Sequence, residues 1–268
     1  MSVAIGQQAA FRRTMTQRDF DRFAILSGDD NPIHVDAAFA ATTHFGGTVA
    51  HGMFLYSNIC RALGLLLPGA VQFEQVLMFP NPTYAGDEVT VSVEVTAVSG
   101  ETAVIATTTA RSNGLPGCQG AARLALSAAG VAGEGETAVV QSTATQMGAY
   151  QLGQRASLTR TFTPDDVTEY VDLVGDENVA DGRLPGALLG SLFSCLLGTE
   201  LPGRGTNWLK QSLRFPHLAH VGEAITATVE IIRLRPEKHL VNLRTTCANP
   251  AGEVVCTGEA LVLAKEMA

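Results

Sequence analysis

Two blocks near the N-terminus are the most informative part of the chain: Gly28-Asp29-Asp30-Asn31-Pro32-Ile33-His34 and Phe45-Gly46-Gly47-Thr48-Val49-Ala50-His51-Gly52-Met53. The residue before a proline is pushed out of the α region, so Asn31-Pro32 predicts a loop rather than a helix. Asp29 and His34 offer a carboxylate and an imidazole that can move protons near neutral pH. The glycines precede an apolar, helix-like segment, where backbone N–H groups can hold an oxyanion. These parts predict acid–base chemistry on a carbonyl compound.

The composition predicts a large core and a weakly charged surface. Of the 268 residues, 46% are hydrophobic and 16% are charged, against about 25% charged in a typical domain. The net charge of −8 argues against a nucleic-acid partner, because such proteins carry a clustered basic face.

The cysteines and the N-terminal residues bear on the cellular compartment of the protein. The five cysteines include no Cys-x-x-Cys pair, as is typical of reduced thiols; they are Cys60, Cys118, Cys195, Cys247 and Cys256. The N-terminus has no basic segment followed by an apolar one, which is the pattern of a signal peptide. No apolar run reaches the ~18 residues that are needed to span a bilayer. The sequence predicts a cytoplasmic protein with no membrane contact.

Along the chain, helix signals come first and strand signals follow. Thr16-x-x-Asp19 resembles a capping pair and predicts a helix that begins near Thr16. Residues 53–67 are apolar almost all the way round, which predicts a helix wrapped by other structure. Valines alternate with polar residues over 89–95, the pattern of a half-buried strand, and residues 104–110 and 121–129 are further strand candidates.

The same order of signals then returns, which indicates a tandem duplication. Arg13-Thr14-Met15-Thr16 is matched by Arg160-Thr161-Phe162-Thr163, and Gly28-Asp29-Asp30-Asn31 by Gly175-Asp176-Glu177-Asn178. A helix, a loop, a buried helix and then strands, made twice, predict two α+β units, each an antiparallel sheet wrapped round a central helix. We predict units at 1–129 and 158–268, joined by a linker at 130–157 that is rich in small residues.

The two N-terminal blocks resemble the hydratase motif of the MaoC-like (R)-specific enoyl-CoA hydratases and dehydratases, the hydratase 2 type. Residues 28–34 match Gly-Asp-x-Asn-Pro-Ile-His at every fixed position, and residues 49–53 match Val-x-His-Gly-Met. The resemblance covers almost the whole chain and implies a tandem (double) hotdog fold, in which the two sheets join into one. It implies reversible hydration of a trans-2-enoyl-CoA to an (R)-3-hydroxyacyl-CoA, with coenzyme A as part of the substrate and no cofactor.

The resemblance also implies roles for single residues. Asp29 and His34 would hold a water molecule and move its protons, and Asn31 would orient the loop. The thioester oxygen would face the N–H of Gly52, where a helix start favours an anion. No His-x-x-His or cysteine pair accompanies the histidines, so no metal is expected. Further substrate contacts are expected from Gly47, Val49, His51, Met53, Arg204 and Lys210.

The two copies differ where the chemistry is expected. Opposite His34 stands Asp181, and the second copy lacks the segment that corresponds to residues 35–45. An imidazole titrates near pH 7, whereas an aspartate does so only when its pKa is strongly raised. We therefore expect one active site per chain, in the first copy. Asp176 and Asn178 would then be structural remnants, and the second copy would shape the substrate pocket.

Other functions fit parts of this pattern. A thioesterase shares the hotdog fold and thioester substrates, because fold alone does not decide function. A dehydratase of a branched or dicarboxylic acyl-CoA, of the methylmalyl or mesaconyl type, would keep the same motif, and a non-catalytic acyl-binding subunit would need only the pocket. Delivery by coenzyme A or by an acyl-carrier protein stays open, as does a monomer (pseudo-dimer) or a homodimer.

Overall fold

The computed structural model describes residues 3–127, 142, 144–179 and 182–264. The first copy supplies five strands: β1 (Gln8–Thr14), β2 (Val71–Met78), β3 (Glu88–Ser99), β4 (Thr102–Arg111) and β5 (Pro116–Ala125). The second copy supplies the five that correspond to them: β8 (Arg155–Thr161), β9 (Asn207–Arg214), β10 (Ala224–Arg235), β11 (Leu240–Ala248) and β12 (Val254–Leu263). A 3₁₀ turn, Pro236–Lys238, links β10 to β11.

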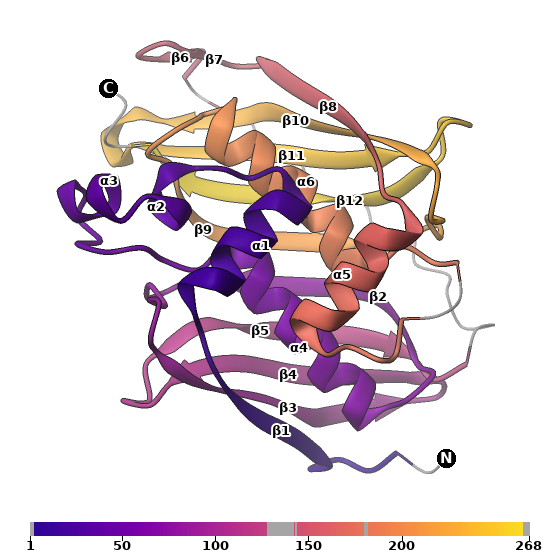
Figure 1. Cartoon of the computed structure of the whole chain (residues 1–268). Coiled ribbons are helices and arrows are strands. Elements are labelled where there is room, and N and C mark those ends of the chain that lie inside the picture. The colour runs from indigo at the N-terminus through magenta and orange to yellow at the C-terminus, as the bar shows by residue number, and fades with distance from the viewer. Residues whose placement is uncertain (1–2, 128–141, 143, 180–181, 265–268) are drawn as a thin grey trace.

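All ten strands form one sheet, in the order β1-β3-β4-β5-β2-β9-β12-β11-β10-β8. β2 and β9 pair antiparallel at its centre, from Glu74 opposite Arg214 to Met78 opposite Lys210. The sheet curves behind the helices, with one copy in each half (Figure 1). The predicted α+β architecture of two hotdog units, with their sheets joined, is confirmed.

The local signals that repeat in the sequence build the same helix twice. These two helices are α1 (Gln17–Ser27) and α5 (Pro164–Val174). Thr16 and Thr163 cap their N-termini, and each accepts from the backbone N–H three residues on. Gly28 and Gly175 end them with φ angles of 76° and 75°, a left-handed conformation that glycine adopts without strain.

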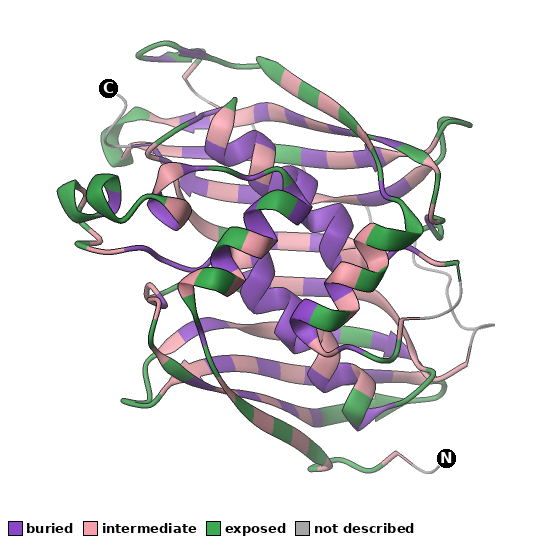
Figure 2. Ribbon diagram, in the orientation of Figure 1, coloured by how far each residue is buried: buried purple, intermediate pink, exposed green. Residues whose placement is uncertain are grey.

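The central helices are α4 (Gly52–Leu66) and α6 (Gly186–Thr199). They lie between the sheet and the outer helices α1 and α5, and they are buried on nearly every side (Figure 2). Valines 89, 91, 93 and 95 on β3 point into the same core, as their alternation predicts. The two helices also contact each other: the Met53 sulfur would lie 2.6 Å from a Cβ placed on Gly190.

The prediction that residues 28–34 form a loop without helix is wrong from Pro32 onward. Pro32–Val35 forms a single helical turn, α2, and Ala37–Thr42 forms a short helix, α3. Proline is accepted at the first helical position because its missing N–H would have no partner there, and the Asn31 side chain caps the turn through the Ile33 N–H. Within the described residues, the second copy has no counterpart of α2 or α3.

The segment between the copies is described only in part. The predicted linker, 130–157, includes a small hairpin of β6 (Gln146–Met147) and β7 (Tyr150–Gln151) and the first residues of β8. The strand predicted over 121–129 ends at Ala125. In the described part of the chain, no helix is long and apolar enough to cross a membrane.

Candidate functional site

A cavity of about 350 Å³ lies between the two copies, at the N-terminal end of α4. The first copy contributes the loop after α1, the turn α2 and the start of α4. The second copy contributes the C-terminal half of α6 and the start of β9. The polar residues that line the cavity include Asp29, Asn31, His34, His44, Ser194 and Asn207.

The Asp29 carboxylate is buried and held in place by hydrogen bonds. Gly28 turns the chain sharply at the end of α1, which leaves Asp29 only 1% exposed. Its Oδ1 accepts the N–H of Asn31 at 3.3 Å, and the Asn31 side chain accepts in turn from Ile33. Asn31 therefore caps α2 with its side chain and bonds to the carboxylate with its backbone N–H.

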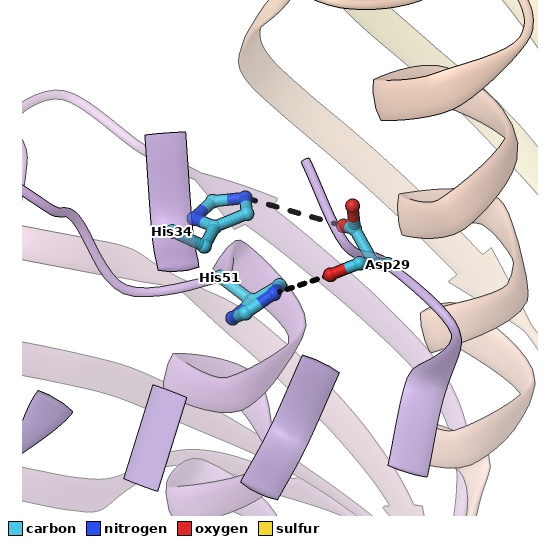
Figure 3. Close-up of side chains that lie close together, drawn as sticks. All are labelled: Asp29, His34 and His51. Atoms are coloured by element: carbon cyan, nitrogen blue, oxygen red, sulfur yellow. Dashed lines mark hydrogen bonds and ion pairs between the residues drawn. The ribbon is translucent and has the colours of Figure 1, made fainter. Parts of the chain in front are cut away.

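The His34 imidazole faces this carboxylate with its basic nitrogen. Its Nδ1 lies 2.7 Å from the carbonyl oxygen of Val49. A carbonyl only accepts, so Nδ1 carries the hydrogen and Nε2 is the free base of the neutral ring. Nε2 lies 4.0 Å from Oδ2 of Asp29 (Figure 3). Burial lowers the pKa of His34, although the Asp29 charge and the Val49 bond oppose this.

His51 supports the pair from behind and does not line the cavity. Its ring stacks on that of His34, with centroids 3.8 Å apart, and its Nε2 donates to the backbone carbonyl of Asp29 at 3.0 Å (Figure 3). Burial lowers the pKa of His51 to about 3. The ring is therefore neutral, and it ties the two halves of the motif together.

Asp29, His34 and His51 offer ligand atoms within 4.8 Å of one another, which raises the question of a metal. The Asp29 carbonyl only accepts, so Nε2 of His51 carries the hydrogen and the lone pair lies on Nδ1, away from Asp29 (Figure 3). Only two of the three groups then converge as ligands, fewer than the three protein ligands of a typical catalytic zinc site. The donor set fits a proton-transfer site better than a metal site.

Ser194 is a functional candidate that the sequence reasoning missed. This buried serine of α6 donates from its Oγ to Oδ2 of Asp29 at 2.5 Å, across 165 residues of chain. The neighbouring Gly198 leaves room for the loop, because a Cβ there would lie 3.0 Å from Oδ1 of Asp29. α6 carries three hydroxyl side chains, Ser191, Ser194 and Thr199, so the sequence alone does not single out Ser194.

Gly52 is the first residue of α4 and lines the cavity. The N–H of a first helical residue has no partner within its helix, so it is available to an anion. A Cβ on Gly52 would lie 2.9 Å from two ring carbons of Phe79, which explains why glycine stands there. The expected oxyanion position thus borders the same cavity as Asp29 and His34.

The remaining predicted substrate contacts divide sharply. Val49 lines the cavity, whereas Gly47, His51, Met53, Arg204 and Lys210 do not. Met53 is fully buried and points toward α6, because the residue after Gly52 faces another side of the helix. Arg204 and Lys210 are exposed. The structure therefore places these five residues outside the cavity, and their contact with a substrate stays a prediction.

A second cavity, of about 240 Å³, lies at the matching place in the other copy. Asp176 and Asn178 line it, and Gly186 stands at the start of α6 with Phe215 against it, as Phe79 stands against Gly52. Burial raises the pKa of Asp176. Asp181, which the sequence places opposite His34, lies outside the described residues.

Comparisons with known proteins point to one family. The family model described as MaoC like domain matches residues 2–113, within the first copy. The (R)-specific enoyl-CoA hydratase of Aeromonas caviae is 45% identical over 112 residues, which cover 41% of this chain and 83% of that protein.

Solved structures match the chain over almost its full length. A MaoC-like dehydratase superposes with a TM-score of 0.75 at 18% identity, over 96% of this chain and 98% of that one. A conserved hypothetical protein from Mycobacterium tuberculosis with a double hotdog fold gives a TM-score of 0.71 at 14% identity, over 97% and 96%. These TM-scores show that the fold is shared. The family is shown by the identity with the Aeromonas caviae hydratase, of which this chain covers 83%. The chain belongs to the MaoC-like family of hydratases and dehydratases, in its double hotdog form.

Proposed function

We propose that this chain reversibly adds water to a trans-2-enoyl-CoA to give an (R)-3-hydroxyacyl-CoA. One observation carries the proposal: the free nitrogen of His34 and the carboxylate of Asp29 face each other across 4.0 Å in a cavity that Gly52 borders. That separation is too long for a direct hydrogen bond. A water molecule bound to both groups, slightly to one side of the line between them, would be close to two proton acceptors.

The pair can account for every proton in the reaction. One member takes a proton from the bound water as its oxygen attacks C3, and the C2=C3 double bond becomes a single bond. The negative charge moves onto the thioester oxygen, which the N–H of Gly52 stabilises. The pair then returns the proton to C2, so one water molecule has been added.

The second copy completes the site in this proposal. Ser194 donates to Oδ2 of Asp29, the oxygen that faces His34, and a carboxylate oxygen can accept a second hydrogen bond from the water. Leu197 and Trp208 of the second copy line the cavity together with Leu55 and Phe79 of the first copy. The acyl chain would lie among these apolar side chains. The proposed reaction moves only protons and water, so it requires no cofactor.

The decisive assay is a scan of crotonyl-, octenoyl- and mesaconyl-CoA that follows the loss of enoyl absorbance, with chiral analysis of the product. We expect hydration to the (R)-alcohol. Release of free thiol, measured colorimetrically in the same reactions, would instead indicate a thioesterase. Turnover of mesaconyl-CoA alone would favour a dicarboxylic substrate.

Variants then test the assigned pair. Asp29→Asn and His34→Ala should each lower kcat by about 10²–10⁴-fold, the usual contribution of positioned proton transfer, while circular dichroism stays unchanged. Asp30→Asn, at the exposed neighbouring carboxylate, is the matched control and should keep wild-type turnover. Full turnover in a folded Asp29 or His34 variant would refute the mechanism.

A further inference from the structure

Gln17, the first residue of α1, makes hydrogen bonds that reach the proposed site from outside it. Its Nε2 donates to the backbone oxygen of His34 at 2.9 Å and to Oδ1 of Asp21 at 2.8 Å. Its Oε1 accepts from Oγ1 of Thr48 at 2.6 Å. Both amide N–H groups and the amide oxygen therefore have partners, which fixes the orientation of the side chain.

These bonds hold the imidazole from two directions. The turn α2 has only four residues, and an isolated helical turn is not stable by itself. Gln17 binds the backbone of α2 at His34. Through Thr48 it also holds the segment whose next residue, Val49, accepts the His34 ring N–H. The Val49 N–H bonds back to the Ile33 carbonyl at 3.1 Å, which closes the network.

We call the hydrogen bonds that Gln17 makes with Thr48 and with the backbone of His34 the Gln17 clamp. The second copy lacks the residues to form it. The residue that corresponds to Gln17 is Pro164, the first residue of α5, and the one that corresponds to Thr48 is Gly182. Proline has no side-chain amide and glycine has no hydroxyl, so neither bond can form. The clamp therefore stands only in the copy that carries the motif imidazole.

We propose that Gln17 and Thr48 are positioning residues that set the gap between the His34 imidazole and the Asp29 carboxylate, an inference that rests on the proposed hydratase function. Neither residue lines the cavity, so neither touches the substrate. Each acts through His34. A displacement of about 1 Å in a reacting group can cost about 10²-fold in rate. Loss of the clamp should therefore lower turnover and leave substrate affinity almost unchanged.

Gln17→Met keeps the length of the side chain and removes its hydrogen bonds, and Thr48→Val removes one hydroxyl. We expect kcat to fall about 10–100-fold in Gln17→Met, with KM within about twofold of the wild type. The double variant should lose little more than Gln17→Met, because the two residues act as one unit. Gln8→Met, which removes an exposed side-chain bond to Glu94, is the matched control and should keep wild-type kinetics.

A second measurement separates positioning from a general loss of stability. The His34 imidazole can be titrated by ¹⁵N NMR in the ligand-free protein. A displaced ring is better solvated, so its pKa should rise in Gln17→Met, and the acid limb of the kcat/KM profile should move to higher pH. A merely structural role would lower Tm and leave the His34 titration in place, and that result would overturn the inference.

The remaining outcomes are also decisive. A folded Gln17→Met with kcat within twofold of the wild type refutes the clamp. If Gln17→Met does not fold, the milder Thr48→Val decides by the same two measurements. If the wild type hydrates no enoyl-CoA, the proposed function fails. The NMR titration, which needs no substrate, then tests by itself whether Gln17 positions His34.

Discussion

Protonation of His51 should destabilise the fold in mild acid. The folded protein holds the pKa of His51 at about 3, against an ordinary value of 6.5. The unfolded chain therefore binds a proton below pH 6.5 that the folded chain does not bind until much lower pH. The stabilisation from the neutral ring is fully present above pH 6.5 and is lost as the pH falls from 6.5 toward 3.

The size of the effect follows from these two values. One proton taken up on unfolding costs about 1.4 kcal/mol per pH unit, so His51 alone should lower the free energy of unfolding by about 2 kcal/mol between pH 7 and pH 5. His34, whose pKa burial also lowers, adds to the loss in the same direction. For a domain with a total stability of about 5–15 kcal/mol, this is a large fraction.

The test compares the wild type with His51→Gln by urea unfolding at pH 7, 6 and 5. Glutamine can donate to the Asp29 carbonyl as the imidazole does, but it does not titrate. The free energy of unfolding should therefore fall by about 2 kcal/mol less in the variant over this range. His220→Gln, at an exposed histidine, should keep the wild-type pH dependence. An equal fall in wild type and His51→Gln would refute the reasoning.

Three further variants test the rest of the site. Gly52→Ala places a Cβ 2.9 Å from the Phe79 ring, so the helix start or the ring must move, and steady-state kinetics should show kcat lowered about 10²-fold in a folded protein. Ser194→Ala leaves Oδ2 of Asp29 without its buried donor, so denaturant unfolding should show a loss of about 1–3 kcal/mol alongside a lower kcat. Asp176→Asn changes only the second cavity, so kcat should stay within about threefold. A loss as large as that of Asp29→Asn would show that the second copy is catalytic.

The parts of the fold that the sequence predicts correctly are encoded locally. The capping residues Thr16 and Thr163, the apolar run that became α4 and the valines of β3 each decide a conformation within a few neighbouring residues. Because these signals occur twice in the same order, they predict both the duplication and the two central helices. The family motif adds which of the two copies carries the imidazole.

The parts that the sequence misses depend on contacts between distant segments. Ser194 reaches Asp29 only because α6 packs beside the loop after α1, and no local pattern reports that contact. His51 was expected at the substrate, but its stacking on His34 places it one layer behind the cavity.

The pairing of β2 with β9 has a consequence for how this gene can change. A chain cut between the copies would expose an unpaired strand in mid-sheet and would remove the hydroxyl that Asp29 needs. We therefore expect the second copy to be free to change around its own cavity but not on these surfaces. Natural variants should tolerate substitutions around Asp176 more readily than on the faces of α6 and β9 that meet the first copy. Separately expressed halves should regain activity only after they associate.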